Sequence, residues 1–244
     1  MLINGNIKHM LNKRLSISIF FPAHNEEANI AKAIEAALSA VQKIDADYEI
    51  IVVNDGSSDR TGVIAENFAK ENSRIRVINH PANLGYGAAV WTGIQASTKE
   101  YIFFTDADLQ FDMEELSRLT QYVPEYEVVL GYRAKRQDSF MRLLNAYGWN
   151  VLNRILFGLK VKDIDCAFKL FKNEIVKILP TESRGAMLSA EILIQLQKKR
   201  IKFKEVPVTH LPRTAGSPTG AKPSVIFRAF REMMRVYKRG VTAR

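Results

Sequence analysis

The segment 101-YIFFTDADLQ-110 joins a short apolar run to a cluster of acids. Residues 101–105 are typical of a strand inside a sheet. Asp106, Asp108 and Gln110 follow at alternate positions, and in an extended segment such residues point the same way. Two carboxylates on one side repel each other unless a positive group lies between them. The segment therefore predicts a buried strand that ends at a cation site.

Two further polar clusters follow apolar runs in the first half of the chain. The cluster 22-PAHNEE-27 follows the run at 15–21, and 54-NDGSSDRT-61 follows the run at 48–53. Helical patterns separate the runs, which favours an α/β fold with a mostly parallel central sheet flanked by helices. Ligands of such sheets bind beyond the carboxyl ends of the strands. We therefore expect the three clusters at one edge of the sheet.

The same alternation predicts the order of elements along the chain. Strands are expected at 15–21, 48–53, 74–79, 101–105, 128–130, 163–171 and 203–208. Helices are expected at 26–41, 59–70, 85–97, 112–122, 139–159, 188–200 and 224–239. In terms of domains, the prediction is a basic tail at 1–14, a single domain at 15–222 and a basic helix at 223–244 that could face a membrane.

Composition sets broad limits. The 244 residues are 47% hydrophobic and 25% charged, an ordinary globular mixture with enough apolar residues for a core. A single cysteine, Cys166, excludes an intrachain disulfide, and we expect it to fill a small buried apolar position. The sequence has no run of 18 apolar residues, so no transmembrane helix is predicted. The first residues lack the apolar segment of a signal peptide.

Charge is distributed unevenly. Residues 1–130 contain 11 Lys+Arg and 18 Asp+Glu, a net charge of −7, whereas residues 131–244 contain 24 and 8, a net charge of +16. The second half is expected to attract phosphates, acidic lipid surfaces or nucleic acid, with a merely solvated basic surface as the alternative. Because no nucleic-acid-binding motif is recognisable, we expect no nucleic-acid partner.

The oxygen ligands at 106, 108 and 110 suit Mg²⁺ or Mn²⁺ better than zinc. Magnesium usually binds through one or two carboxylates plus substrate phosphates. The segment therefore predicts a divalent cation that holds a diphosphate, and the alternative is a solvated acidic loop that caps the next helix. Asp55 is expected either to contact a ribose or base or to form a turn, and Gly85 and Gly87 to allow a close backbone approach.

Several segments together carry a family resemblance. In their order and spacing, 22-PAHNEE-27, 52-VVNDGSSDRTG-62, 83-NLGYGAAVWTG-93 and 105-TDADLQ-110 resemble the inverting glycosyltransferases of family 2, which have the GT-A (nucleotide-diphospho-sugar transferase) fold. A second set of matches resembles the dolichol-phosphate (polyprenol-phosphate) mannose synthase branch and its glucosyl relatives. It consists of 131-GYR-133, 163-DIDCAFKLF-171, Glu191, 205-EVPV-208 and the loop with Arg213, Gly216 and Ser217.

The resemblance implies roles for individual residues. The positions that match donor-binding residues are Pro22, Ala23, Glu26, Asp55, Asp106 and Arg133. Those that match ligands of the metal are Asp106, Asp108 and Gln110. The acceptor would be bound by Lys169, Arg213 and Ser217, and the resemblance gives Asp108, Lys169 and Arg213 the catalytic roles.

The function implied by this resemblance is that of a metal-dependent inverting glycosyltransferase. It would move a hexose of the mannose or glucose type from a nucleotide-diphosphate sugar to a polyprenyl (dolichyl) phosphate. Such an acceptor needs no catalytic base, since a phosphate monoester is mostly ionised at neutral pH, with a second pKa of about 6. The enzyme would be cytoplasmic and peripheral on the inner face of an anionic membrane, with residues 139–159 either partly in the interface or packed in the core.

Two other enzymes remain as alternatives. A soluble family 2 glycosyltransferase that acts on a glycan hydroxyl would need a carboxylate base, for which Glu191 is the candidate. A sugar nucleotidyltransferase would need a glycine-rich loop and a basic residue after the first strand, where this chain has 22-PAHNEE-27.

Overall fold

The computed structural model describes residues 14–123, 125–134, 140–213 and 223–240. Its sheet has seven strands in the order β3–β2–β1–β4–β6–β5–β7. These are β1 (Ser16–Ala23), β2 (Asp47–Asn54), β3 (Ile75–Asn79), β4 (Tyr101–Thr105), β5 (Val128–Arg133), β6 (Phe168–Lys172) and β7 (Phe203–Val208). Only β6 runs antiparallel to its neighbours, so the predicted α/β fold with a mostly parallel sheet is confirmed.

The central strands β1, β2 and β4 are the most fully buried strands of the sheet. Along β1, β2 and β4 nearly every residue is buried, and the runs of Ile, Val and Phe match strands that are covered on both faces. The two edge strands, β3 and β7, have more exposed side chains. The carboxyl ends of β1, β2 and β4 therefore lie side by side in the middle of the sheet, where the polar clusters emerge.

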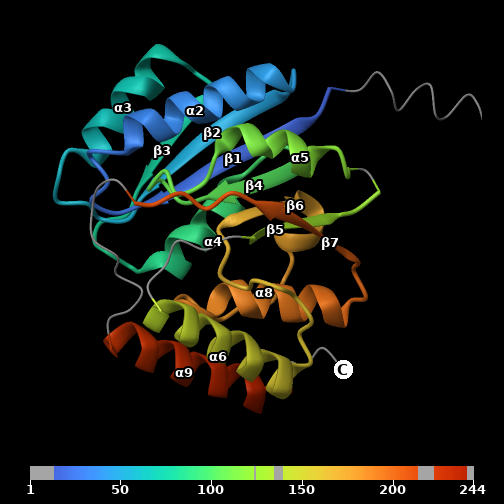
Figure 1. The fold of residues 1–244 in the computed structure, drawn as a ribbon. Coiled ribbons are helices and arrows are strands. Elements are labelled where there is room, and N and C mark those ends of the chain that lie inside the picture. Colours follow the sequence, from blue (N-terminus) through green and yellow to red (C-terminus); the bar gives the residue numbers. More distant parts are fainter. Residues whose placement is uncertain (1–13, 124, 135–139, 214–222, 241–244) are drawn as a thin grey trace, which may run out of the picture.

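Helices cover both faces of the sheet (Figure 1). On one face lie α2 (Ile30–Lys43) and α3 (Thr61–Glu71), and on the other lie α4 (Tyr86–Ala96) and α8 (Met187–Lys198). The helices α6 (Phe140–Phe157) and α9 (Pro223–Lys238) form an outer layer beyond α8. The shorter elements are η1 (Met113–Glu115), α5 (Leu116–Thr120) and α7 (Asn173–Val176).

Three predicted elements differ clearly from the observed ones, and most of the others are shifted by one or two residues at an end. The helix expected from residue 26 begins only at Ile30, because residues 27–29 form a turn and the N–H groups of Glu26 and Glu27 donate to side chains of the cluster at 54–61. The helix expected at 112–122 is divided into η1 and α5. The strand expected from residue 163 begins at Phe168, because residues 163–167 form a loop whose Asp163 pairs with Arg133.

The helix α6 has features of both interpretations of residues 139–159. Leu152 and Leu156 pack against the core, whereas Leu144, Tyr147 and Ile155 are exposed on another side. Aromatic contacts join it to α9, with ring centroids 6.2 Å apart for Trp149 and Phe230. None of the described helices is long and apolar enough to cross a membrane.

Candidate active site

The clusters at residues 22–27 and 54–61 form one hydrogen-bonded unit at the carboxyl ends of β1 and β2. The backbone N–H of Asn25 donates to Ser57 Oγ at 3.0 Å, and that of Ser58 donates back to Asn25 Oδ1 at 2.9 Å. Glu26 N–H donates to Thr61 Oγ1 at 2.8 Å. Parallel pairing of the two strands brings the clusters together, which confirms that they share one edge.

The third cluster has a different backbone from the one predicted. The extended arrangement expected for residues 106–110 is wrong, because β4 ends at Thr105 and the chain turns directly after it. Leu109 has a φ of 59°, in the left-handed region that residues with a side chain rarely adopt. The turn is closed by the N–H of Gln110, which donates to Asp108 Oδ1 at 3.1 Å.

Each of the two aspartates contacts a different neighbour. Asp106 Oδ1 accepts a hydrogen bond of 2.9 Å from the hydroxyl of Tyr86, the first residue of α4. Asp108 Oδ2 lies 2.6 Å from Nη2 of Arg213, whose Nη1 lies 3.5 Å from Glu26 Oε1 at the end of β1. The guanidinium of Arg213 thus lies between two carboxylates.

The segment after β7 brings Arg213 to the turn at 106–110. His210 forms an isolated antiparallel bridge with Phe111, and the N–H of Leu211 donates to the carbonyl of Gln110 at 2.8 Å. The side-chain amide of Gln110 in turn donates to the carbonyl of Leu211 at 3.2 Å. These bonds orient the side chain of Gln110 and place Arg213 next to Asp108.

The electrostatics of this edge favour an added positive charge. Burial and repulsion by Asp108 raise the pKa of Asp106, although Tyr86, Lys169 and Arg213 oppose the shift. Burial also raises the pKa of Glu26, and hydrogen bonding from Asn29 and the charge of Arg213 only partly offset it. Ionised carboxylates that are held close together in a buried site are stabilised by a nearby cation.

These residues fit a hard divalent cation. Among the described residues, no group of three His, Cys, Asp or Glu side chains gathers as a complete metal cage. Magnesium does not need one, since it commonly binds one or two carboxylates, several waters and the phosphates of its substrate. Asp106 and Asp108, with the amide oxygen of Gln110, would hold the ion, which would neutralise a departing diphosphate.

Asp55 has a structural partner for each oxygen. Its carboxylate is buried and accepts 2.9 Å hydrogen bonds from the N–H groups of Leu84 and Gly85, and His80 Nδ1 lies 2.7 Å from it. Next to it, Pro22 and Ala23 pair with the end of β2. The predicted donor contacts of these three residues stay predictions, and the observed role of Asp55 is to hold the loop that precedes α4.

Two of the predicted basic residues have buried side chains, and one of them, Lys169, acts electrostatically on the turn at residues 106–110, here called the acidic turn. Arg133 donates to both oxygens of Asp163, each at 2.7 Å. Lys169 is the second residue of β6 and donates to the carbonyl of Cys166, and burial lowers the pKa of its ammonium group. Their contacts with the donor or acceptor stay predictions. Ser217 lies outside the described residues, and Cys166 is buried as expected.

Glu191 has a structural environment. It is fully buried on α8 and accepts hydrogen bonds from the N–H groups of Glu182 and Ser183, at 2.8 Å in the case of Ser183. Arg239 Nη1 lies 3.2 Å from it. A carboxylate that is used in this way to hold a loop is poorly suited to deprotonate an acceptor hydroxyl.

Sequence reasoning missed the part played by Tyr86. Its glycine neighbours were interpreted as positions of close approach, which is correct: a Cβ on Gly87 would lie 2.3 Å from the carbonyl oxygen of Gly185. The signal that could have revealed Tyr86 is a hydroxyl-bearing residue between two such glycines, on the same edge as the acids.

The chain is similar to known glycosyltransferases. The family model of glycosyl transferase family 2 matches residues 18–179. The chain is 33% identical over 210 residues to an undecaprenyl-phosphate 4-deoxy-4-formamido-L-arabinose transferase of Pectobacterium atrosepticum, covering 85% of this chain and 63% of the relative. It is 29% identical over 230 residues to the dolichyl-phosphate beta-glucosyltransferase of Saccharomyces cerevisiae, covering 83% and 69%. The chain thus spans somewhat less than two thirds of the first of these relatives.

A similar fold occurs among solved structures. Glucosyl-3-phosphoglycerate synthase from Mycobacterium tuberculosis, in complex with phosphoglyceric acid, has a TM-score of 0.72 at 20% identity and covers 95% of this chain and 82% of its own. The same synthase in complex with Mn²⁺, uridine diphosphate and glucosyl-3-phosphoglycerate has a TM-score of 0.70 at 19% identity, with the same coverage. The GT-A fold is therefore shown, and the chain belongs to glycosyl transferase family 2.

Proposed function

We propose that the protein is a metal-dependent inverting glycosyltransferase that moves a glucose- or mannose-type hexose from a nucleotide-diphosphate sugar to a polyprenyl phosphate. In the proposed reaction an oxygen of the acceptor phosphate forms a bond to the anomeric carbon. The bond from that carbon to the donor diphosphate breaks, and the nucleoside diphosphate leaves with the electron pair. Curated relatives named as undecaprenyl-phosphate and dolichyl-phosphate sugar transferases support this class of acceptor.

The observation that carries the proposal is the carboxylate pair at the end of β4 with a guanidinium already beside it. Asp108 and Glu26 both face Arg213, and Asp106 lies in the same turn as Asp108. A divalent cation bound by the aspartates would take over the neutralisation of Asp108. Arg213 would then be available to a phosphate, which its fork can bind through two hydrogen bonds.

The environment of Glu191 favours the phosphate acceptor over the glycan hydroxyl. A hydroxyl acceptor needs a base within hydrogen-bond reach, and the base suggested by the sequence is buried and engaged with residues 182 and 183. A phosphate acceptor arrives already ionised and needs only positive groups to position it. Arg213 meets that need at the acidic turn.

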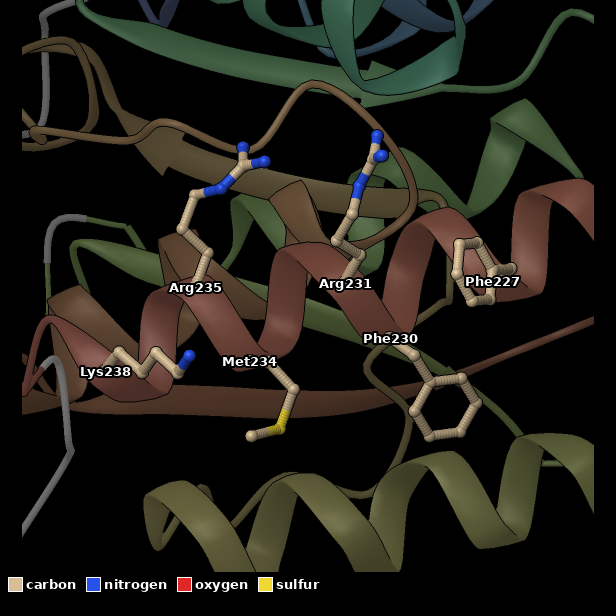
Figure 2. Close-up of a pocket in the computed structure, with 6 residues that line it drawn as sticks. All are labelled: Phe227, Phe230, Arg231, Met234, Arg235 and Lys238. Atoms are coloured by element: carbon tan, nitrogen blue, oxygen red, sulfur yellow. The ribbon is translucent and has the colours of Figure 1, made fainter.

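The outer layer of α6 and α9 suits a membrane surface on the cytoplasmic side. A pocket on α9 is lined by Phe227, Phe230, Arg231, Met234, Arg235 and Lys238. Figure 2 shows Arg231 and Arg235 extending to one side of α9, and Phe230 and Met234 extending toward α6 on the other. Phe227 is 71% exposed. Exposed aromatic residues beside a row of cations are typical of helices that lie in a membrane interface.

Acceptor specificity tests the function directly. The protein is incubated with Mn²⁺, a panel of labelled nucleotide sugars, and either polyprenyl phosphate, the corresponding polyprenol or a glycan. We expect label only in the polyprenyl phosphate product, with inverted anomeric configuration. Efficient transfer to the glycan would instead support the soluble-transferase alternative.

Liposome binding tests the membrane part separately. Replacing Arg235 and Lys238 by Gln should weaken binding to anionic vesicles by about 1 kcal/mol per charge, or roughly thirtyfold for both. The matched control replaces Lys32 and Lys70 on α2 and α3, which removes the same charge from the opposite face of the sheet. Equal losses in both double variants would contradict a surface centred on α9.

A further inference from the structure

Tyr86 connects α4 to the acidic turn, although nothing in its local sequence requires a phenol. It is the first residue of α4, and its hydroxyl lies 2.9 Å from Oδ1 of Asp106. The residue as a whole is 43% exposed, so core packing alone does not explain a tyrosine at this position. The hydrogen bond to Asp106 is the specific contact that a phenylalanine could not make.

The backbone that carries Tyr86 is fixed by the end of β2. Leu84 and Gly85, the two residues before Tyr86, each donate a backbone N–H to one oxygen of Asp55 at 2.9 Å. Gly85 has a φ of 99°, which residues with a Cβ rarely adopt. The chain therefore enters α4 along a defined path, and Tyr86 is not a freely moving surface side chain.

A second contact holds the start of α4 in place. The loop at 184–185 lies so close to Gly87 that a Cβ there would be 2.3 Å from Gly185 O. That loop is held in turn by Glu232 of α9, which accepts from the N–H of Gly185 at 3.2 Å. Tyr86 is thus supported between the sheet and the outer helices, with its hydroxyl directed at Asp106.

We propose that Tyr86 is a positioning residue for the cation site. Its hydroxyl engages one oxygen of Asp106 and so orients the carboxylate toward the cation that Asp106 and Asp108 would share. Carboxylates that bind metals are commonly oriented by such outer hydrogen bonds, and loss of one typically lowers metal affinity tenfold to a hundredfold. This inference rests on the proposed function, because it assumes that the acidic turn binds a divalent cation.

The test compares Tyr86→Phe with wild-type protein in Mn²⁺ binding, followed by electron paramagnetic resonance, with Mn²⁺ alone and with added UDP or GDP. We expect the dissociation constant for Mn²⁺ to rise tenfold or more. The Mn²⁺ concentration for half-maximal transfer should rise by a similar factor, while kcat at saturating Mn²⁺ changes less. A role confined to packing would leave both Mn²⁺ readouts unchanged.

The matched control is Tyr122→Phe, which removes the same hydroxyl from a tyrosine whose ring contacts Tyr126 and Lys204. It should bind Mn²⁺ as the wild type does. Equal Mn²⁺ affinity in Tyr86→Phe and wild type would overturn the role of Tyr86 and leave the proposed function intact. Wild-type protein that binds no Mn²⁺ and transfers sugar without it would overturn both.

Discussion

The two ends of the central sheet use buried carboxylates in opposite ways. At the amino ends of the parallel strands, Glu49 accepts hydrogen bonds from Ser18 Oγ at 2.7 Å, Thr98 N–H at 2.6 Å and Arg76 Nη2 at 2.8 Å. Burial alone would raise the pKa of Glu49, but these bonds outweigh it and lower the pKa to about 2. At the carboxyl ends, burial and Asp108 raise the pKa of Asp106.

The difference separates a structural carboxylate from a functional one. The protein itself supplies the donors that keep Glu49 ionised, so Glu49 stabilises the fold. At the other end, Asp106 and Asp108 share one turn, and in the proposed function a divalent cation neutralises part of their charge. Both groups are carboxylates at the end of a strand, and their partners decide the role.

The largest expected effect is on catalysis, at the carboxyl end. Asp108→Ala removes a predicted metal ligand and the partner of Arg213, so transfer should fall by about a hundredfold to a thousandfold or more. The thermal midpoint should change little, because relief of the repulsion with Asp106 offsets the lost contacts with Arg213 and Gln110. The control is Asp112→Asn, which alters the exposed cap of η1 nearby. Full transfer by Asp108→Ala would contradict the functional assignment.

The next effect is on stability, at the amino end. Hydrogen bonds hold the pKa of Glu49 well below its ordinary value of 4.5, and Glu49→Gln leaves some of their donors unpaired, so the free energy of unfolding at pH 7 should fall by roughly 1–3 kcal/mol. Chemical denaturation measures this loss. The Mn²⁺ requirement of the remaining folded enzyme should match the wild type. Glu114→Gln, which disrupts an exposed pair with Lys43, is the control and should destabilise far less.

Replacing Arg213 should lower sugar transfer and raise Mn²⁺ affinity. Arg213→Ala removes the proposed charge-assisted contact to the acceptor phosphate, worth about 1.5–3 kcal/mol, so transfer should fall roughly tenfold to a hundredfold. Mn²⁺ affinity without donor should rise, since the competing guanidinium beside Asp108 is gone. Arg213→Lys should recover only part of the transfer. Unchanged transfer in Arg213→Ala would remove this residue from the mechanism.

The smallest effect appears in the pH dependence of stability. A carboxylate with a lowered pKa stabilises the fold above its ordinary value of 4.5, and this stabilisation is lost as the pH falls toward 2. Between pH 6 and 3.5, wild-type protein should therefore lose roughly 1 kcal/mol more unfolding free energy than Glu49→Gln. Parallel pH profiles for the two proteins would show that Glu49 is not the responsible group.

Much of the fold followed from hydrophobic patterns. The strands expected at 101–105 and 203–208 have the observed bounds, because apolar or alternating runs end there at polar residues. The strand expected at 128–130 extends to Arg133, because pairing with β7 continues past Gly131, where the apolar run stops. Long-range pairing of this kind is not encoded in the local pattern.

The site was predictable in its residues and less so in its geometry. The acids after β1, β2 and β4 were found from their positions at strand ends. The left-handed turn at Leu109 could not be predicted, because it depends on the contacts of residues 210–213 with residues 108–111. The same holds for Glu191, whose structural role depends on a loop nine residues earlier and on Arg239.

The most direct test of the cation site is the divalent-metal dependence of sugar transfer into lipid. Wild-type protein is incubated with labelled nucleotide sugar and polyprenyl phosphate after complete chelation, and Mn²⁺ or Mg²⁺ is then added back. We expect no labelled lipid under chelation, full recovery on adding the metal, and no recovery in Asp108→Ala. Equal incorporation of label with and without the metal would contradict the assignment of the carboxyl end of the sheet as a cation and diphosphate site.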